Sequence, residues 1–166
     1  MLPANAWSFN FSVDRQRLFF VQCAYGPDRA RAPCSLKAQP VSGGASHIIF
    51  QDQTNVLEAI RVFSPAWLLF IISSGNGDTS RDGLWRIDAD GTGLSHLSTT
   101  TNSYFNLSSQ SPWSDVSRDG SMYSLYDIGE QDKLYIGSFR SKKITLIATL
   151  AQDLWSEEGI VGWTVC

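Results

Sequence analysis

The chain has few of the residues on which several classes of function depend. It contains two histidines and three cysteines among 166 residues, and charged residues make up only 17%. Two histidines leave few candidates for the general base of a nucleophilic catalytic set. The net charge of −3 argues against the broad basic surface that nucleic acid requires. We therefore expect no nucleic-acid partner.

Long apolar runs and familiar catalytic motifs are missing as well. The longest apolar run, Ala66 to Ile72, is far shorter than a membrane-spanning helix, so no membrane span is expected. The opening "MLPANAWSF" has no basic region followed by an apolar core, so no signal peptide is visible. There is no G-x-S-x-G elbow or P-loop, and neither "GNGDTS" nor "GTGLSH" completes a dinucleotide fingerprint. These absences favour a protein with no catalytic residues and no cofactor.

Apolar and aromatic side chains are plentiful by contrast. Hydrophobic residues make up 43% of the chain, which includes six Trp, nine Phe and five Tyr. Such a composition is typical of a globular protein whose sheets pack through large side chains. The length is sufficient for one domain with its own core.

The most informative feature is a repeat. Three passages resemble one another: "WSFNFSVDRQRLFFVQ", "IRVFSPAWLLFIIS" and "PWSDVSRDGSMYSLYD". Their turn serines are Ser12, Ser64 and Ser117, which lie 52 and 53 residues apart. A period of this size indicates stacked supersecondary units, and it predicts a β-propeller.

Each repeat contains four strand signals separated by turns rich in Gly, Ser and Asp, which predicts an antiparallel meander. We expect an all-β fold with three four-stranded antiparallel blades and one extra inner strand, in a single domain. The approximate units are 4–53, 54–106 and 107–153, with the start of a fourth at 154–166. The expected strands are 6–14, 17–23, 34–41, 45–51, 57–65, 67–73, 83–89, 94–99, 111–117, 121–128, 133–139 and 144–150.

Two passages resemble the TolB-type, WD-repeat-like β-propeller family. The residues 112–127 are similar to the "W-S-P-D-G" half of that family's repeat, and "GLWRIDADGTGLSHLST" at 83–99 is similar to its "D-x-D-G" half. The resemblance implies a propeller fold, and an extracytoplasmic location if the parent protein is exported as TolB-like proteins are. Because propellers carry many different activities, it does not assign a function.

The number of repeats predicts an incomplete ring. Closed propellers typically contain four to eight blades, whereas this chain has three repeats and a strand signal around Trp163. Three blades alone would leave two sheet faces open. Either the chain is a piece of a longer protein, or two copies associate as a homodimer that completes a six-bladed ring.

Cys23 and Cys34 flank the loop "AYGPDRARAP". If the strands on either side form a hairpin, the two cysteines face each other at its neck and a disulfide can close the loop. Two buried free thiols are the alternative. The sequence leaves both open.

Other polar residues have structural interpretations. His47 and His96 occupy matching places in two repeats, too far apart for one zinc ion, so we expect no metal site. The loop "DADGTG" has calcium-type spacing, but Thr99 stands where a bidentate Glu is needed, and a hairpin turn explains it better. Asp115, Asp119 and Asp127 are interpreted as turn residues rather than acid–base groups.

The loops between the second and third strands vary in length, and variable loops on a regular scaffold commonly carry function. Charged residues in two of them should share one rim, as a binding surface or as a solvated edge: Arg29, Arg31, Asp78, Arg81 and Asp82. The preferred hypothesis is a non-catalytic propeller module whose rim loops bind a protein or peptide. The alternative is a fragment of a propeller enzyme, or the substrate-gating propeller of a serine peptidase.

Overall fold

The computed structural model describes residues 5–24, 33–62, 64–74, 79–98, 103–104, 117, 119, 121–127, 133–141 and 143–149. These residues form antiparallel sheets, with one short 3-10 helix, η1 (Thr79–Arg81), so the predicted all-β class is confirmed. The chain divides into two compact units, Met1–Thr101 and Asn102–Cys166. Among the described residues, no helix has the length and hydrophobicity to cross a membrane.

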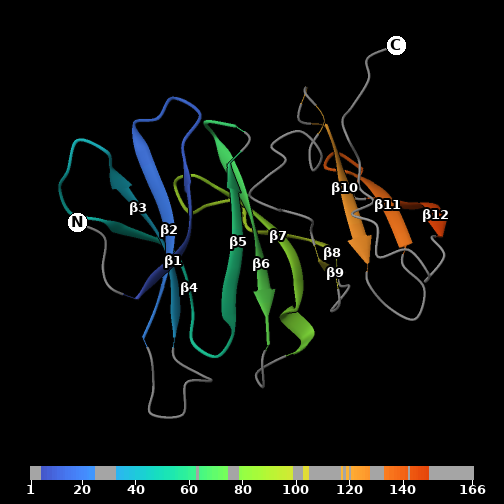
Figure 1. The fold of residues 1–166 in the computed structure, drawn as a ribbon, viewed down its shortest axis with the longest axis horizontal. Coiled ribbons are helices and arrows are strands. Elements are labelled where there is room, and N and C mark those ends of the chain that lie inside the picture. The colour runs from blue at the N-terminus through green and yellow to red at the C-terminus, as the bar shows by residue number, and fades with distance from the viewer. Residues whose placement is uncertain are drawn as a thin grey trace, which may run out of the picture. The chain divides into compact units, whose positions relative to one another are not determined.

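The first sheet contains β1 (Ala6–Phe11), β2 (Arg17–Cys23), β3 (Cys34–Pro40) and β4 (His47–Asp52) in sequential order (Figure 1). Every neighbouring pair is antiparallel. The strands follow the alternation and the Gly, Ser and Asp turns seen in the sequence. A bulge between Trp7 and Phe9 interrupts the register of β1.

The second sheet repeats this order with β5 (Val56–Val62), β6 (Trp67–Ser73), β7 (Gly83–Asp88) and β8 (Ser95–Ser98). It also has a bulge in its first strand, between Glu58 and Arg61. Both sheets therefore break the register of the first strand at a similar place, as repeats of one unit should.

The core of the first unit lies between these two sheets. It contains Phe19 and Val21 from β2 together with Leu68, Phe70 and Ile72 from β6, all less than 2% exposed. Successive side chains of a strand point to opposite faces, so alternate residues of β2 and β6 meet in this layer. Burial of this apolar area is what holds the two sheets together.

The third sheet belongs to the second unit. It contains β9 (Ser103–Tyr104), β10 (Met122–Asp127), β11 (Lys133–Ser138) and β12 (Ile144–Thr149), again in sequential order. Its first strand was expected at 111–117, of which only Ser117 is described. Ser103 and Tyr104 of β9 pair with the end of β10, although the sequence repeat assigned them to the preceding repeat, 54–106. The expected fourth unit, 154–166, lies outside the described residues.

The serine turns recur as the sequence indicated. The Oγ atom of Ser12 donates to the carboxylate of Asp14 and accepts from the backbone N–H of Arg17 at 2.9 Å. Ser117 makes the same contacts with Asp119 and with the N–H of Met122, also at 2.9 Å. Side-chain hydrogen bonds of this kind satisfy backbone groups that a tight turn leaves unpaired.

Candidate functional site

Three connections of the first unit lie at one end of its sheets. Because the strands reverse direction in turn, the β2–β3 loop, the β4–β5 connection and the β6–β7 loop all leave the sheets at the same end. We call this the loop end. Arg81 and Asp82, two of the predicted rim residues, lie at this end, and polar contacts between the two sheets are found here.

A disulfide joins Cys23 and Cys34 at the neck of the β2–β3 loop. The two residues are cross-strand partners with Cα atoms 4.1 Å apart, and the next pair outward is closed by the Ala24 N–H donating to the Pro33 carbonyl. Cys23 and Cys34 are thus a non-hydrogen-bonded pair, the type in which side chains approach most closely. Of the two alternatives that the sequence left open, the structure contains the disulfide.

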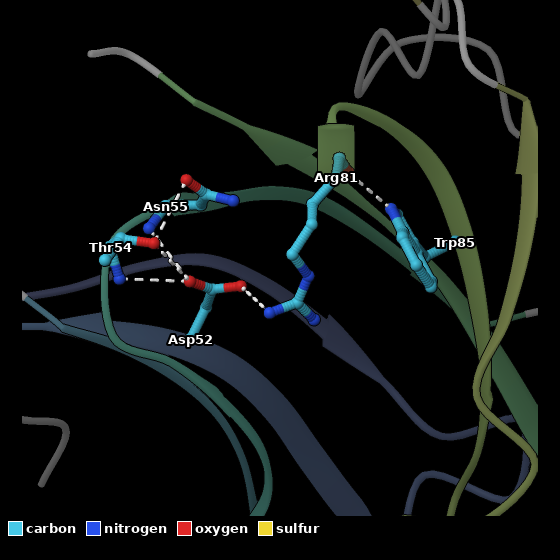
Figure 2. Close-up of polar contacts among 5 residues, drawn as sticks. All are labelled: Asp52, Thr54, Asn55, Arg81 and Trp85. Carbon is cyan, nitrogen blue, oxygen red and sulfur yellow. Dashed lines mark hydrogen bonds and ion pairs between the residues drawn. The ribbon is translucent and has the colours of Figure 1, made fainter. Parts of the chain in front are cut away.

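Asp52, the last residue of β4, is a buried carboxylate (Figure 2). Its Oδ1 accepts from the backbone N–H groups of Thr54 at 3.0 Å and Asn55 at 2.9 Å. Its Oδ2 lies 2.8 Å from Nη1 of Arg81. One side chain therefore closes a turn through Oδ1 and forms an ion pair with Arg81 through Oδ2, and the nearby cation offsets part of the cost of burying the charge.

Arg81 reaches Asp52 from η1, across the boundary between the sheets (Figure 2). Its Cζ atom lies 5.6 Å from the ring centre of Phe50 and 5.7 Å from that of Trp85, within range of cation–π attraction. The Arg81 carbonyl accepts a hydrogen bond from Nε1 of Trp85 at 2.8 Å. The side chain of Arg81 nevertheless remains 35% exposed.

Trp85 also contacts His96, a residue of β8 that hydrogen-bonds to the end of the β6–β7 loop. Its ring stacks on that of His96, with centroids 4.2 Å apart and planes 3° from parallel. Nε2 of His96 lies 3.0 Å from the carbonyl oxygen of Asp82, which can only accept, so this nitrogen carries the proton of the hydrogen bond. His96 thus holds the β6–β7 loop in place.

Asp82 differs from the expectation of an exposed rim residue. It is 8% exposed, and its Oδ2 accepts a hydrogen bond from Ser74 Oγ at 2.9 Å across the neck of the loop. Arg81 is likewise committed to a contact between sheets rather than free in solvent. Arg29, Arg31 and Asp78 lie outside the described residues.

Sequence reasoning missed Asp52, Phe50 and Trp85 as members of this site. A signal for Asp52 was available: an Asp at the start of "DQTN" between two strands is typical of an Asx turn. The aromatic pair gave no such signal, because its contact with Arg81 depends on how the sheets pack.

The "DADGTG" loop is a tight hairpin. The N–H of Asp88 donates to the Thr92 carbonyl at 2.9 Å, and the carboxylate of Asp90 accepts from the N–H and hydroxyl of Thr92 at 2.9 and 2.7 Å. These hydrogen bonds lower the pKa of Asp90. Gly91 and Gly93 have positive φ, and a Cβ at Gly93 would collide with the Asp88 carboxylate. In the described part of the chain, no three His, Cys, Asp or Glu side chains gather as a metal site.

Several solved structures have a fold similar to that of this chain. An oligogalacturonate lyase in complex with manganese matches with a TM-score of 0.61 and 16% identity, over 90% of this chain and 44% of its own. TolB from Acinetobacter baumannii matches with a TM-score of 0.58 and 16% identity, over 85% and 31%. The β-propeller domain of the Trilobed protease from Pyrococcus furiosus matches with a TM-score of 0.60 and 10% identity, over 89% and 43%.

The fold is that of a β-propeller. The sequence resemblance to TolB-type propellers is therefore matched by a likeness of fold. At these identities the likeness concerns the fold alone. The chain spans less than half the length of each of these three structures. No protein-family model and no curated protein sequence matches the chain.

Proposed function

We propose that this chain is a β-propeller module that binds a protein or peptide at the loop end of its first unit. The observation that supports the proposal most directly is the placement of Arg81. Asp52, Phe50 and Trp85 hold its guanidinium in one position while 35% of the side chain stays exposed. A cation held in this way binds an incoming group without first losing conformational freedom.

The chemistry of Arg81 favours an acidic ligand. A guanidinium has five N–H donors, and the ion pair with Asp52 joins only one of its nitrogens to that carboxylate. A carboxylate of a peptide side chain or C-terminus is a suitable acceptor for the exposed donors. The β2–β3 loop, whose sequence contains Arg29 and Arg31, begins and ends at the same end of the sheets.

Selection from a phage-displayed random peptide library, followed by titration of the selected peptides, tests this proposal. We expect acidic peptides whose affinity falls about tenfold or more in Arg81→Gln. Arg86→Gln is the matched control, because Arg86 also pairs with an aspartate and a tryptophan. Its side chain is 32% exposed, its Nη2 lies 3.7 Å from Oδ1 of Asp88, and its Cζ lies 4.8 Å from the ring centre of Trp67. Equal affinities for both variants, measured on protein that circular dichroism shows to be folded, would contradict the proposed site.

A second candidate function follows from the nature of the similar structures. They include a lyase and a protease domain, so this chain is alternatively the propeller part of an enzyme. A longer reading frame that encodes a G-x-S-x-G domain after Cys166 would favour this candidate. Peptide hydrolysis by the longer product, abolished when the Ser of that motif is replaced by Ala, would then establish it.

A further inference from the structure

Asp82 follows Arg81 in the chain and is a buried carboxylate that no cation of the described residues balances. It is 8% exposed, and its two oxygens differ in their surroundings. Oδ2 accepts from Ser74 Oγ at 2.9 Å, whereas Oδ1 is buried with no hydrogen-bond partner among the described residues. The ion pairs in this part of the chain, at Arg81 and Arg86, do not include Asp82. Buried carboxylates are usually paired, so this one calls for an explanation.

The contacts that hold the β6–β7 loop also fix Asp82 beside Arg81. The carbonyl oxygen of Asp82 accepts from Nε2 of His96 at 3.0 Å, and the His96 ring stacks on Trp85. Nε1 of Trp85 donates to the carbonyl oxygen of Arg81 at 2.8 Å. Because Asp82 is buried, water and salt screen its charge poorly. Its charge therefore acts on any group that binds at Arg81.

The loop end has no surplus of positive charge. The charges of Arg81 and Asp52 offset one another in their ion pair (Figure 2), and Asp82 adds a further negative charge. The sequences of the two loops do not alter this balance. Residues 24–33 contain two arginines and one aspartate, and residues 74–82 contain one arginine and two aspartates. Phosphate sites, by contrast, typically gather several arginines.

A carboxylate and a phosphate monoester bring different charges to such a site. A carboxylate carries one negative charge, whereas a phosphoserine carries about −1.5 to −2 at pH 7. The cost of removing an ion from water rises with the square of its charge, whereas the attraction to a fixed cation rises only in proportion to that charge. Because Asp52 and Asp82 weaken the attraction, the second charge of a phosphate is not compensated at Arg81.

From this balance we infer that the loop end is selective for a carboxylate over a phosphate monoester, and that Asp82 determines this specificity. The inference rests on the proposed function, since it concerns the acidic group that Arg81 binds. The carboxylate belongs to an acidic side chain of a peptide or to its C-terminus, and either presents two oxygens to the guanidinium. Asp82 acts through its charge, which repels two negative charges twice as strongly as one.

Isothermal titration calorimetry with one selected acidic peptide tests the inference. Replacement of its Glu or Asp by the amide, and amidation of its C-terminus, identify which carboxylate Arg81 binds. That carboxylate is then replaced by a phosphate, as phosphoserine within the peptide or as a phosphoethanolamide at its C-terminus. At about pH 7.5, where the phosphate is mostly a dianion, we expect the phosphate form to bind at least about tenfold more weakly than the carboxylate form.

Asp82→Asn separates the effect of charge from that of shape. The amide has the size of the carboxylate, and its oxygen can accept from Ser74. We expect both peptide forms to bind more tightly, and the fold gain of the phosphate form to be about the square of the other, because the repulsion removed acts on two charges. Asp88→Asn is the matched control: Asp88 ends β7, is 37% exposed and pairs with Arg86, so neither affinity should change.

The outcomes separate this inference from the proposed function. Acidic peptides that bind independently of Arg81, or a failure to select any, overturn both. A carboxylate form that needs Arg81, with a phosphate form of equal or higher affinity, overturns the inference alone. Equal gains of the two forms in a folded Asp82→Asn, or no gain, overturn it as well. If circular dichroism shows that Asp82→Asn is unfolded, the comparison of the two forms in the unmodified chain decides.

Discussion

The first and second sheets have the same strand order and nearly the same register, yet they close their ends by different means. At the loop end, a disulfide joins the strands of the first sheet, whereas the second has the Asp82–Ser74 hydrogen bond and the Arg81–Asp52 ion pair. At the other end, the first sheet has a Ser-x-Asp turn, and the second has Ser64, which accepts from the N–H of Ala66 at 3.1 Å.

This difference indicates which parts of the repeat determine the fold. Both sheets share the alternation of apolar and polar residues along their strands and the bulge in the first strand, so these features determine the architecture. The closures differ because many chemical groups can satisfy the ends of a hairpin. The first strands also differ in exposure, since Ile60 of β5 is 1% exposed while Phe9 of β1 is 61% exposed. Phe20 and Phe70, which match one another in the second strands, are both 0% exposed.

The largest expected effect separates a buried phenylalanine from an exposed one. Phe70→Ala should lower the free energy of unfolding by about 3 to 5 kcal/mol, because it removes a buried ring and leaves a cavity between the sheets. Phe9→Ala should cost less than about 1 kcal/mol under conditions where the protein is monomeric. Urea denaturation of both variants measures the two values. Similar losses would show that Phe9 is buried in solution.

Loss of the disulfide should have the next largest effect. In the chain-entropy model a bridge across 11 residues contributes about 3 kcal/mol, so Cys23→Ser/Cys34→Ser should lose about that much. Thermal unfolding with and without reductant checks the value in the unmodified chain.

Thiol counting checks the redox state directly. Alkylation of denatured, non-reduced protein made in an oxidising compartment should find one free thiol, that of Cys166. Three free thiols would contradict the bridge. Protein that is reduced before alkylation serves as the control and should show all three cysteines.

Substitution of Asp52 tests how much the ion pair with Arg81 stabilises the loop end of the second sheet. Asp52→Ala removes the acceptor of two backbone N–H groups and the partner of Arg81, so we expect a loss of about 2 to 3 kcal/mol. Arg81→Ala should cost less, because Arg81 is 35% exposed. A double-mutant cycle measures their coupling. Additive effects of the two substitutions would show that the ion pair contributes no stability.

The sequence predicted most strands well, because alternation and turn residues are local signals. The expected strands 17–23 and 67–73 have the same bounds as β2 and β6. The strand expected at 111–117 lies outside the described residues apart from Ser117, and β9 was not predicted, since Ser103 and Tyr104 carry no alternation long enough to be recognised.

The candidate site was predicted only in part. The sequence singled out Arg81 and Asp82 because they are charged residues in a variable loop. It did not indicate that Asp82 turns inward to Ser74, or that Arg81 crosses to Asp52 of the other sheet. Both depend on packing between segments far apart in the chain, which no local pattern encodes.

A smaller effect is expected at the turns. Ser12→Ala removes an oxygen that accepts from Arg17 N–H and donates to Asp14, so it should cost about 1 kcal/mol. Ser64→Ala removes the exposed hydrogen bond from the Ala66 N–H, so it should lower the free energy of unfolding by only a few tenths of a kcal/mol. Chemical denaturation of the two variants compares them. A larger loss at Ser64 would reverse the proposed order of the two closures.

The smallest effect is the pH dependence of the serine turns. Hydrogen bonds from Ser117 and Ser121 lower the pKa of Asp119 from 3.8 to about 2, and those from Ser12 and Gln16 lower the pKa of Asp14. A lowered pKa in the folded state means that the unfolded chain binds protons first, so this stabilisation is present above pH 3.8 and is lost toward about pH 2.

The Ser64 turn has no carboxylate at the matching position, where Ala66 stands, so it should not share this dependence. Carboxylate titrations followed by NMR should place Asp119 well below an unperturbed aspartate, and Ser117→Ala should move its pKa upward, because it removes the largest stabilising hydrogen bond. Asp90, whose hydrogen bonds come from Thr92, is the internal control and should not move. A pKa of Asp119 that stays unchanged in Ser117→Ala would show that the serine hydroxyl does not stabilise the carboxylate.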